Sequence, residues 1–211
     1  MLSPNTKKRA SAREKILELA EASVLQKGFG ATSIEELIAG AGITKSGFFY
    51  HFKDKNDLAK ALMERYLERD AQLLDDMFAR ADELSDDPLH GFLVGLKFFA
   101  ELMGNLPDMH PGCLAAAYCY QEQLFSHDIR ELNREGVLIW RRRFMERLER
   151  IAKRYPPRID VDLEEVADHV AVVVDGAITL TKTLKERALL AKQILHYRNY
   201  VKLLFEPAHA A

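Results

Sequence analysis

The sequence has 211 residues, a mass of 24.1 kDa and a formal net charge of -2, with 48% hydrophobic and 29% charged residues. This composition is typical of a soluble globular chain and excludes a disordered or collagen-like protein. Charges interrupt the strongly apolar stretches well before ~20 residues, which excludes a membrane span, and no apolar run follows the basic N-terminus, so we expect no signal peptide and a cytoplasmic location.

The first part of the chain predicts short helices with recognisable ends. Apolar residues recur at helical spacing over residues 16–24, and Gly28 supplies a helix stop. Ser33 and Glu36 have the spacing of a capping box, in which each side chain satisfies a free backbone N–H. They open a second helix, which we expect to end near residues 40–42.

Residues 33–52 predict helix-turn-helix geometry. Thr44 caps a short helix over residues 45–51, and the tight segment 40–43 joins this helix to the one before it. In this motif one helix crosses the DNA backbone and the next lies in the major groove. The charge distribution agrees, because residues 1–55 carry a net charge of +3 and the rest of the chain sums to -5.

Helical periodicity continues to the end of the chain, without a convincing strand or repeat. Asp54 caps a long helix that runs to about Arg80, ~40 Å at 1.5 Å per residue. Pro88 begins the next helix, and two prolines and a glycine predict a loop over residues 105–112. Further helices are expected over residues 113–125, 128–155, 161–184 and 188–205. The fold is therefore predicted to be all-α, with about nine helices.

Four motifs near the N-terminus match a known family. They are Phe29–Ile34, Ile38–Ala39, Ala41–Lys45 and His51–Leu58. Together they closely resemble the DNA-binding domain of TetR-family regulators over about residues 8–58, while the rest of the chain agrees only in length and helical character. The resemblance implies a helix-turn-helix DNA-binding domain over residues 1–54 and a helical effector-binding and dimerisation domain over residues 55–211.

The function implied by this resemblance is that of a homodimeric transcriptional repressor, released from DNA when a small molecule binds. A two-fold dimer presents two recognition helices about one DNA turn apart, so the operator is expected to be an inverted repeat. The resemblance places the dimer interface in the helices over 161–184 and 188–205. The first of these is apolar nearly all round, with small Gly176 and Ala177, although a core helix of a monomer is the alternative. Expected partners are double-stranded DNA, a second copy and an unidentified effector, with no membrane.

The alternative function is a small-molecule-binding protein or enzyme that retains a vestigial helix-turn-helix head. Turnover needs a paired acid and base or a metal cluster, and neither is present at interpretable spacing. The cysteines Cys113 and Cys119 have no zinc-ligand spacing. We therefore expect no enzyme activity, no cofactor and no metal.

The resemblance also implies DNA contacts residue by residue. Thr32, His51 and Lys55 are expected to bind the phosphate backbone, and Lys45 and Ser46 to address base edges or adjacent phosphates. With their neighbours on the recognition helix, the expected DNA-binding residues are Thr32, Thr44, Lys45, Ser46, Gly47, Tyr50, His51 and Lys55.

The aromatic residues of the recognition helix depart from the family pattern. The family usually has Tyr at the position of Phe49, where the hydroxyl contacts phosphate, and here Tyr50 follows instead. We assign the polar contact to Tyr50. Phe48 and Phe52 are expected to anchor the small core, and Gly47 to allow a close approach to DNA.

Candidate effector contacts lie on the helices of the second domain. Aromatic, amide and other soft polar side chains suit a mostly apolar pocket, and they suit an ordinary core equally well. Cys113 follows His110 at an expected helix start, so it is either a redox or electrophile sensor with a lowered pKa or a plain buried cysteine. The candidates are Phe99, Met103, Cys113, Tyr118, Gln121, Trp140, Phe144 and His169.

Two basic clusters admit more than one interpretation. Lys7-Lys8-Arg9 is either an arm that binds DNA phosphates or a solvated terminus. The seven basic residues between Arg141 and Arg154 are interleaved with, and followed by, acidic residues. A salt-bridged surface is therefore favoured there over an anion-binding site.

Overall fold

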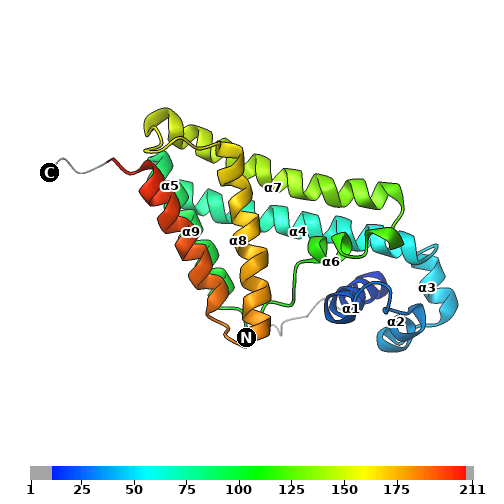
Figure 1. The fold of residues 1–211 in the computed structure, drawn as a ribbon. Coiled ribbons are helices and arrows are strands. Elements are labelled where there is room, and N and C mark those ends of the chain that lie inside the picture. The colour runs from blue at the N-terminus through cyan, green and yellow to red at the C-terminus, as the bar shows by residue number, and fades with distance from the viewer. Residues whose placement is uncertain (1–10, 208–211) are drawn as a thin grey trace, which may run out of the picture.

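The computed structural model describes residues 11–207, and these residues form nine α-helices and one 3₁₀ helix without any strand (Figure 1). The prediction of an all-α chain with about nine helices is confirmed. The basic segment Lys7-Lys8-Arg9 lies outside the described residues, so its two interpretations stay open. None of the helices described here is long and apolar enough to cross a bilayer.

Three short helices form the N-terminal head: α1 (Ala12–Lys27), α2 (Ile34–Ala41) and α3 (Lys45–His51). Side-chain caps fix where all three of them begin. The Ser33 hydroxyl accepts from the Glu36 N–H at 3.1 Å, and the Thr44 hydroxyl accepts from the Gly47 N–H at 3.1 Å. Between them Gly42 ends α2 in the left-handed conformation, with φ 68°. The caps and the glycine therefore set the angle at which α3 leaves α2.

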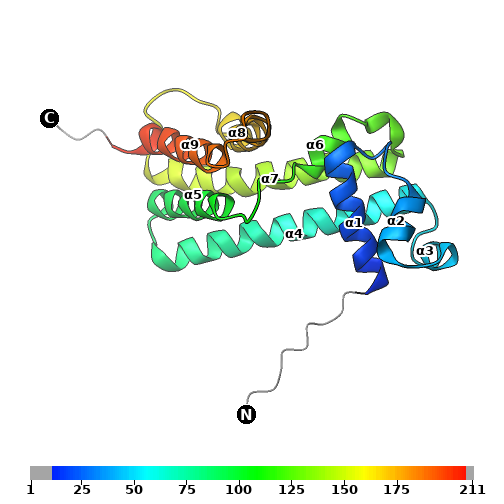
Figure 2. The same ribbon diagram turned by 90° about the horizontal axis from the view of Figure 1, so that it is seen from below.

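The other helices form an elongated body in which α4 and α7 run side by side along its length (Figures 1 and 2). They are α4 (Lys55–Leu84), α5 (Pro88–Gly104), α6 (Leu114–Cys119), the 3₁₀ helix η1 (Glu122–Leu124), α7 (His127–Arg154), α8 (Leu163–Leu184) and α9 (Leu189–Phe205). Helix α5 packs on α4 and α9, and α8 packs on α7 and α9.

The single helix predicted over residues 113–125 is wrong in extent. Helix α6 ends at Cys119, and the chain then tightens into bonds between residues three apart, from the Gln121 N–H to the Tyr118 carbonyl and from the Leu124 N–H to the Gln121 carbonyl. This turn places the Phe125 ring 4.7 Å from the ring of Phe29 in the head. Packing against the head therefore prevails over the helical periodicity of the segment.

Two hydrophobic cores share the long helix α4. Its first half gives Leu58, Leu62 and Met63 to the head core, and its second half gives Leu74 and Phe78 to the body core. The head core also takes residues from α6 and α7, including Tyr118 and Ile129. The boundary predicted between residues 54 and 55 stays a prediction, but the helix that begins there belongs to both cores.

Gly42 gives a test of how strongly the turn before α3 is determined. An added Cβ at this position meets no atom within 4 Å, so Gly42→Ala changes only the backbone preference. We expect it to lower the free energy of unfolding by about 1 kcal/mol, because the left-handed region disfavours a side chain. Gly42→Asn should lose less, since Asn tolerates this region better. Chemical denaturation measures both, and an unchanged stability in Gly42→Ala would contradict the assigned turn.

Candidate functional site

Helix α3 presents one polar surface to solvent and one apolar surface to the head core. Thr44, Lys45 and Ser46 are exposed at its start, and the ring of Tyr50 is 84% exposed. Gly47 and His51 are half-buried at the edge of the same surface. The structure therefore brings these six predicted DNA-binding residues together on one short helix and its cap.

The apolar side of α3 is held by two phenylalanine rings. Phe48 and Phe52 are 0% and 1% exposed, and their ring centroids lie 5.6 Å apart, which confirms them as anchors of the head core. Phe49 packs edge-on against Phe48 at 5.4 Å. Of the two neighbouring rings, Tyr50 is the more exposed, and it alone carries a hydroxyl.

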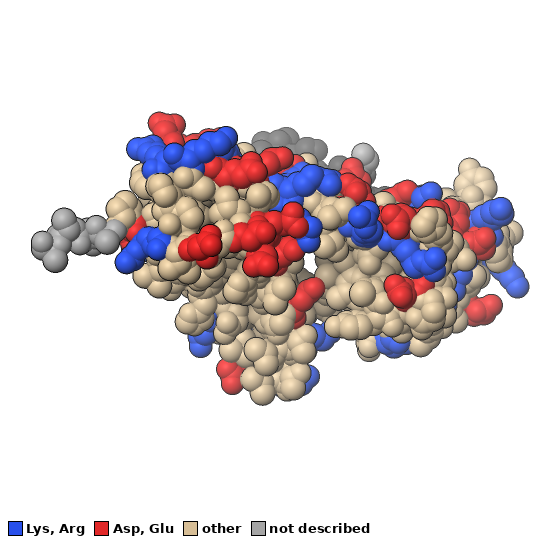
Figure 3. Space-filling model, turned by 45° about the horizontal axis from the view of Figure 1, so that its top comes forward, with Lys and Arg blue, Asp and Glu red and all other residues tan. Residues whose placement is uncertain are grey.

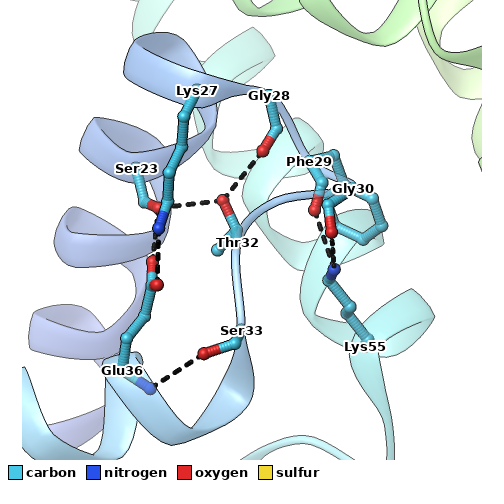
Figure 4. Close-up of polar contacts among 9 residues, drawn as sticks. All are labelled: Ser23, Lys27, Gly28, Phe29, Gly30, Thr32, Ser33, Glu36 and Lys55. Carbon is cyan, nitrogen blue, oxygen red and sulfur yellow. Dashed lines mark hydrogen bonds and ion pairs between the residues drawn. The ribbon is translucent and has the colours of Figure 1, made fainter.

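Thr32 does not lie on this surface. It is 1% exposed, and its hydroxyl donates to the Gly28 carbonyl at 3.0 Å and lies 2.9 Å from the Ser23 hydroxyl (Figure 4). These contacts close the turn between α1 and α2. We therefore correct the phosphate contact expected of Thr32 to a structural role, since a buried hydroxyl with internal partners has no face left for DNA.

Lys55 also turns toward the α1–α2 turn. Its ammonium donates to the carbonyls of Phe29 at 2.7 Å and Gly30 at 3.3 Å, and lies 4.5 Å from the centre of the Phe29 ring (Figure 4). Burial lowers the pKa of Lys55, and the charge of Glu36 opposes this shift. Two of its three donors are therefore used inside the protein, and its expected phosphate contact stays a prediction.

A polar network ties α2 to α1 beside this turn. The Glu36 carboxylate accepts from the Lys27 ammonium at 2.5 Å and from the Ser23 hydroxyl at 2.6 Å (Figure 4). The Lys27 and Ser23 hydrogen bonds hold the pKa of Glu36 below its usual value. Glu36 thus joins the two helices as well as belonging to the N-terminal turn of α2.

The body contacts the head at the α1–α2 turn. The Gly30 N–H donates to the Gln121 side-chain oxygen at 3.1 Å, and Gly28, with φ 87°, leaves room for that amide. Tyr118 is 2% exposed, stacks on Phe125 at 4.2 Å and donates its hydroxyl to the Ala59 carbonyl at 2.9 Å. Tyr118 and Gln121 were expected to contact an effector. The structure instead assigns both to the head–body joint, because partners from distant segments occupy their polar groups.

A cavity of about 290 Å³ lies in the body next to the head. Its walls come from α1, α4, α5, α6, α7, α8 and the segment before α6. Four predicted effector residues line it: Phe99, Met103, Cys113 and Trp140. Phe144 does not, because it is 0% exposed in the body core, and neither does His169, which lies exposed beside Tyr197 and Tyr200.

The acidic and phenolic groups of this cavity were missed by the sequence analysis. The Asp70 carboxylate accepts from the Trp140 indole N–H, and the Tyr66 hydroxyl donates to the Cys113 sulfur at 3.7 Å. Asp175 lies on the α8 wall. Tyr66, Asp70 and Leu73 are spaced four and three residues apart, so they share one face of α4. An aspartate within that mostly apolar stripe was the available signal.

Cys113 has the environment of a protonated thiol. Burial and the nearby charge of Asp175 raise its pKa to about 11. Its sulfur accepts from the Ala116 N–H at 3.4 Å, so it caps α6. A reactive thiolate needs a lowered pKa. The structure therefore favours a half-buried structural cysteine over the sensor.

The basic residues of α7 form a salt-bridged surface, as the sequence analysis favoured. Arg141 pairs with Glu164 at 2.7 Å and Asp168 at 2.6 Å, and Arg147 pairs with Asp82 at 2.9 Å. Arg142, Arg143 and Arg154 pair with Glu135, Asp75 and Asp87. Lysine, arginine and acidic side chains accordingly intermix over this part of the body (Figure 3).

Sequence comparison gives a family match in the head and the start of α4. Residues 16–62 match the model of bacterial regulatory proteins of the tetR family. The transcriptional repressor KstR2 of Mycobacterium tuberculosis is 32% identical over 76 residues, which cover 36% of this chain and 34% of that protein. The transcriptional regulator AcrR of Shigella flexneri is 38% identical over 52 residues, covering 25% of this chain and 24% of that protein. The chain thus matches about a third or less of these relatives' length.

Solved structures extend the likeness to the whole fold. A TetR transcriptional regulator from Chloroflexus aurantiacus superposes with a TM-score of 0.75 at 22% identity, covering 93% of this chain and 97% of that one. Reduced NemR of E. coli superposes with a TM-score of 0.74 at 20% identity, covering 94% and 99%. Residues 16–62 therefore match the tetR family by sequence, and the described residues as a whole share the fold of these solved regulators.

Proposed function

We propose that this chain is a dimeric, ligand-responsive transcriptional regulator that represses from an inverted-repeat operator. The observation that carries the proposal is the exposed polar surface of α3, capped by Thr44 and anchored by Phe48, within a head that matches DNA-binding regulators. A rigid short helix with exposed polar groups at its N-terminal end is what major-groove reading requires.

Within this function, Lys45, Ser46 and Tyr50 are the side chains that α3 offers to bases and phosphates. Gly47 has no side chain, so the α3 backbone between them comes close to the DNA. Thr44 and His51 flank this surface, and Lys55 keeps one donor for a phosphate. The helix sets the register, and the charged groups supply sequence-independent affinity.

Dimerisation is supported by unpartnered apolar side chains on α8 and α9. Val172 and Leu180 of α8 are 68% and 45% exposed, and Leu203 of α9 is 65% exposed. Between the first two, Gly176 has no atom within 4 Å of an added Cβ. Large exposed apolar residues grouped on neighbouring helices indicate a partner surface, and a glycine among them permits close helix approach.

The cavity supports the ligand response. Its wall includes Glu21 and Leu25 of α1 and residues 110–113, which lead directly into α6. Helix α6 and the turn after it hold the head through Tyr118 and Gln121. A ligand that binds one arrangement of this wall better than another therefore shifts the angle of the head, and with it the spacing of the two α3 helices.

Selection of bound duplexes from a random pool tests the function. We expect the purified chain to enrich an inverted repeat whose half-sites lie about one helical turn apart, ~34–36 Å or slightly more. Gly47→Ala should fold and lose operator affinity. Salt-sensitive binding with no enriched sequence would leave a nonspecific binder. No binding by a folded dimer would favour the alternative of a binding protein or enzyme, which a screen for mass changes in added small molecules would then test.

Salt titration separates phosphate contacts from structural residues. We expect Lys45→Ala to alter sequence preference if it reads bases, or to reduce the salt slope by about 0.9 if it binds one phosphate. Lys55→Ala should reduce the slope similarly and also lower stability, because two carbonyls lose their donor. Thr32→Val should keep the slope and lower the free energy of unfolding by about 1 kcal/mol or more. A reduced slope in Thr32→Val would restore its phosphate role.

Sedimentation measures the mass of the species in solution and so tests whether the chain dimerises through α8 and α9. Val172→Lys together with Leu203→Lys should convert the chain to a folded species of monomer mass, 24.1 kDa, because each lysine places a charge in an apolar interface. Leu84→Lys is the matched control, since Leu84 is 63% exposed at the end of α4, on a different helix. A double variant that stays dimeric would place the interface elsewhere.

A further inference from the structure

Two carboxylates line the cavity without a counter-ion. Asp70 stands on the α4 wall and Asp175 on the α8 wall, and neither takes part in an ion pair among residues 11–207. Asp70 is half-buried and its carboxylate accepts a neutral indole N–H from Trp140. Asp175 lies nearer solvent, on the same helix as exposed Gly176. The two acids therefore face one space from different helices.

The cationic groups nearest to these acids are bound elsewhere. Arg69 reaches the cavity wall, but its guanidinium donates to the Glu21 carboxylate at 2.5 Å, so this pair is neutral. Arg143 donates to Asp75 and to the Ala71 carbonyl. Among the described residues that line the cavity, the charges that remain uncompensated are negative.

A basic imidazole does not change this balance. Burial and the charge of Lys182 lower the pKa of His110, which favours its neutral form. The Lys182 ammonium itself donates to the Pro111 carbonyl at 2.7 Å. Lys182 keeps its positive charge in that contact, but it is not among the described residues that line the cavity, and the loop that carries His110 and Pro111 contributes no cation of its own.

The remaining wall is aromatic and aliphatic. Phe99 and Trp140 pack edge to face with ring centroids 6.2 Å apart, and Tyr66 lies on the same wall as Asp70. Leu73, Met103, Val174 and Ile178 complete it. Aromatic faces attract a cation through their ring quadrupoles, and aliphatic walls gain free energy when an apolar group covers them.

The electrostatic response of neighbouring groups agrees with a negative cavity. Loss of hydration raises the pKa of Asp70, against the Trp140 hydrogen bond and the charges of Arg143 and Arg69, and it raises the pKa of Asp175 against a hydrogen bond with Cys113. Burial raises the pKa of Tyr66, and the charges of both aspartates raise it further. An anionic ligand would meet repulsion here, and a neutral ligand would leave both carboxylates without a counter-ion.

We propose that the effector of this regulator is an amphipathic organic cation, whose charge faces Asp70 and Asp175 and whose apolar part lies against Phe99, Met103 and Trp140. The cavity volume suits a small aromatic or branched ammonium compound. The inference rests on the proposed function in one respect, because release of DNA by the cation requires that the chain is a DNA-binding regulator. The binding itself is measured without DNA.

Three benzyl compounds of matched shape test the charge. They are benzyltrimethylammonium, its uncharged carbon isostere neopentylbenzene, and phenylmethanesulfonate. Trp140 is the single tryptophan of the chain, so its fluorescence reports occupancy of this cavity in the full-length protein. We expect saturable binding of the cation, at least about tenfold tighter than the neutral isostere, and no saturable binding of the sulfonate. Equal affinity for cation and isostere, or preference for the sulfonate, would overturn the proposal.

Substitution of the acids locates the charge recognition. Asp70→Asn and Asp175→Asn should each weaken the cation about tenfold and leave neopentylbenzene unchanged, since they remove charge with little change of shape. Asp76→Asn, an exposed position on α4 beyond the cavity, is the matched control and should bind like the parent chain. Sedimentation confirms that each variant keeps its oligomeric state. Unchanged cation affinity in both cavity variants would overturn the assignment.

The affinity of the cavity for the cation should change with pH in one direction. Because both aspartate pKa values are raised, protonation begins above the usual aspartate range, and cation affinity should fall as the pH is lowered through it. Benzyltrimethylammonium keeps its charge at every pH, so the change reports the protein. A pH-independent affinity would contradict the role of these carboxylates.

A duplex assay run in parallel separates this inference from the proposed function. If the chain selects an operator but does not discriminate the three benzyl compounds, the effector class is wrong and the regulator stands. If the chain binds the cation with the expected variants but selects no duplex, the cation site stands and the regulator is wrong. If both hold, the cation should also weaken operator affinity.

Discussion

The interaction on which the site depends is the packing of Phe29 between head and body. Its ring lies 4.7 Å from Phe125 and 6.0 Å from Tyr118, both of which come from the segment after the cavity loop. Lys55 donates to the carbonyls beside it, and Gln121 accepts from the next N–H. The α1–α2 turn is thereby fixed from three sides. The orientation of α3 follows from that turn, because the caps of α2 and α3 leave little freedom between them.

This packing makes the head and the cavity mechanically continuous. Cys113 lines the cavity and caps α6, while Tyr118 at the far end of α6 enters the head core. A six-residue helix is a short, stiff element, ~9 Å at 1.5 Å per residue, so a displacement at its first residue is transmitted to its last. Helix α4 provides a second route, because its two halves belong to the two cores.

Local signals in the sequence predict most of the fold and the recognition surface. Ser33, Thr44 and Asp54 begin helices where their hydrogen bonds to nearby N–H groups allow, and Gly28 and Gly42 end them with positive φ. Such signals act over three or four residues, so the spacing of residue types suffices to find them. The exposed residues of α3 follow, since a short capped helix with one buried phenylalanine face leaves its other face to solvent.

The errors have two causes, a local contact at Thr32 and contacts with distant parts of the sequence over residues 113–125. Thr32 has the polarity of a DNA contact, and its hydroxyl donates instead to the Gly28 carbonyl, four residues before it. The Gln121 side chain accepts a hydrogen bond from Gly30, 91 residues away. The helix expected over residues 113–125 ends at Cys119, before this contact. Periodicity does not report contacts of this range. Of the eight effector candidates, four line the cavity and four do not. The sequence pattern does not separate them, because the same residue types occur in a core and in a cavity wall.

The carboxylates of the cavity show how such a residue can nevertheless be recognised. An apolar side chain at position 70 would continue the stripe of α4 between Tyr66 and Leu73, and would avoid the cost of dehydrating a charge. Asp70 gains one hydrogen bond from Trp140, which an uncharged acceptor would also accept. Packing and hydrogen bonding therefore give no reason for a charge at position 70, and Asp175 adds a second negative charge to the same cavity. A positive ligand supplies the missing interaction in the native state alone, so the same carboxylates that destabilise the empty cavity make it selective for what fills it.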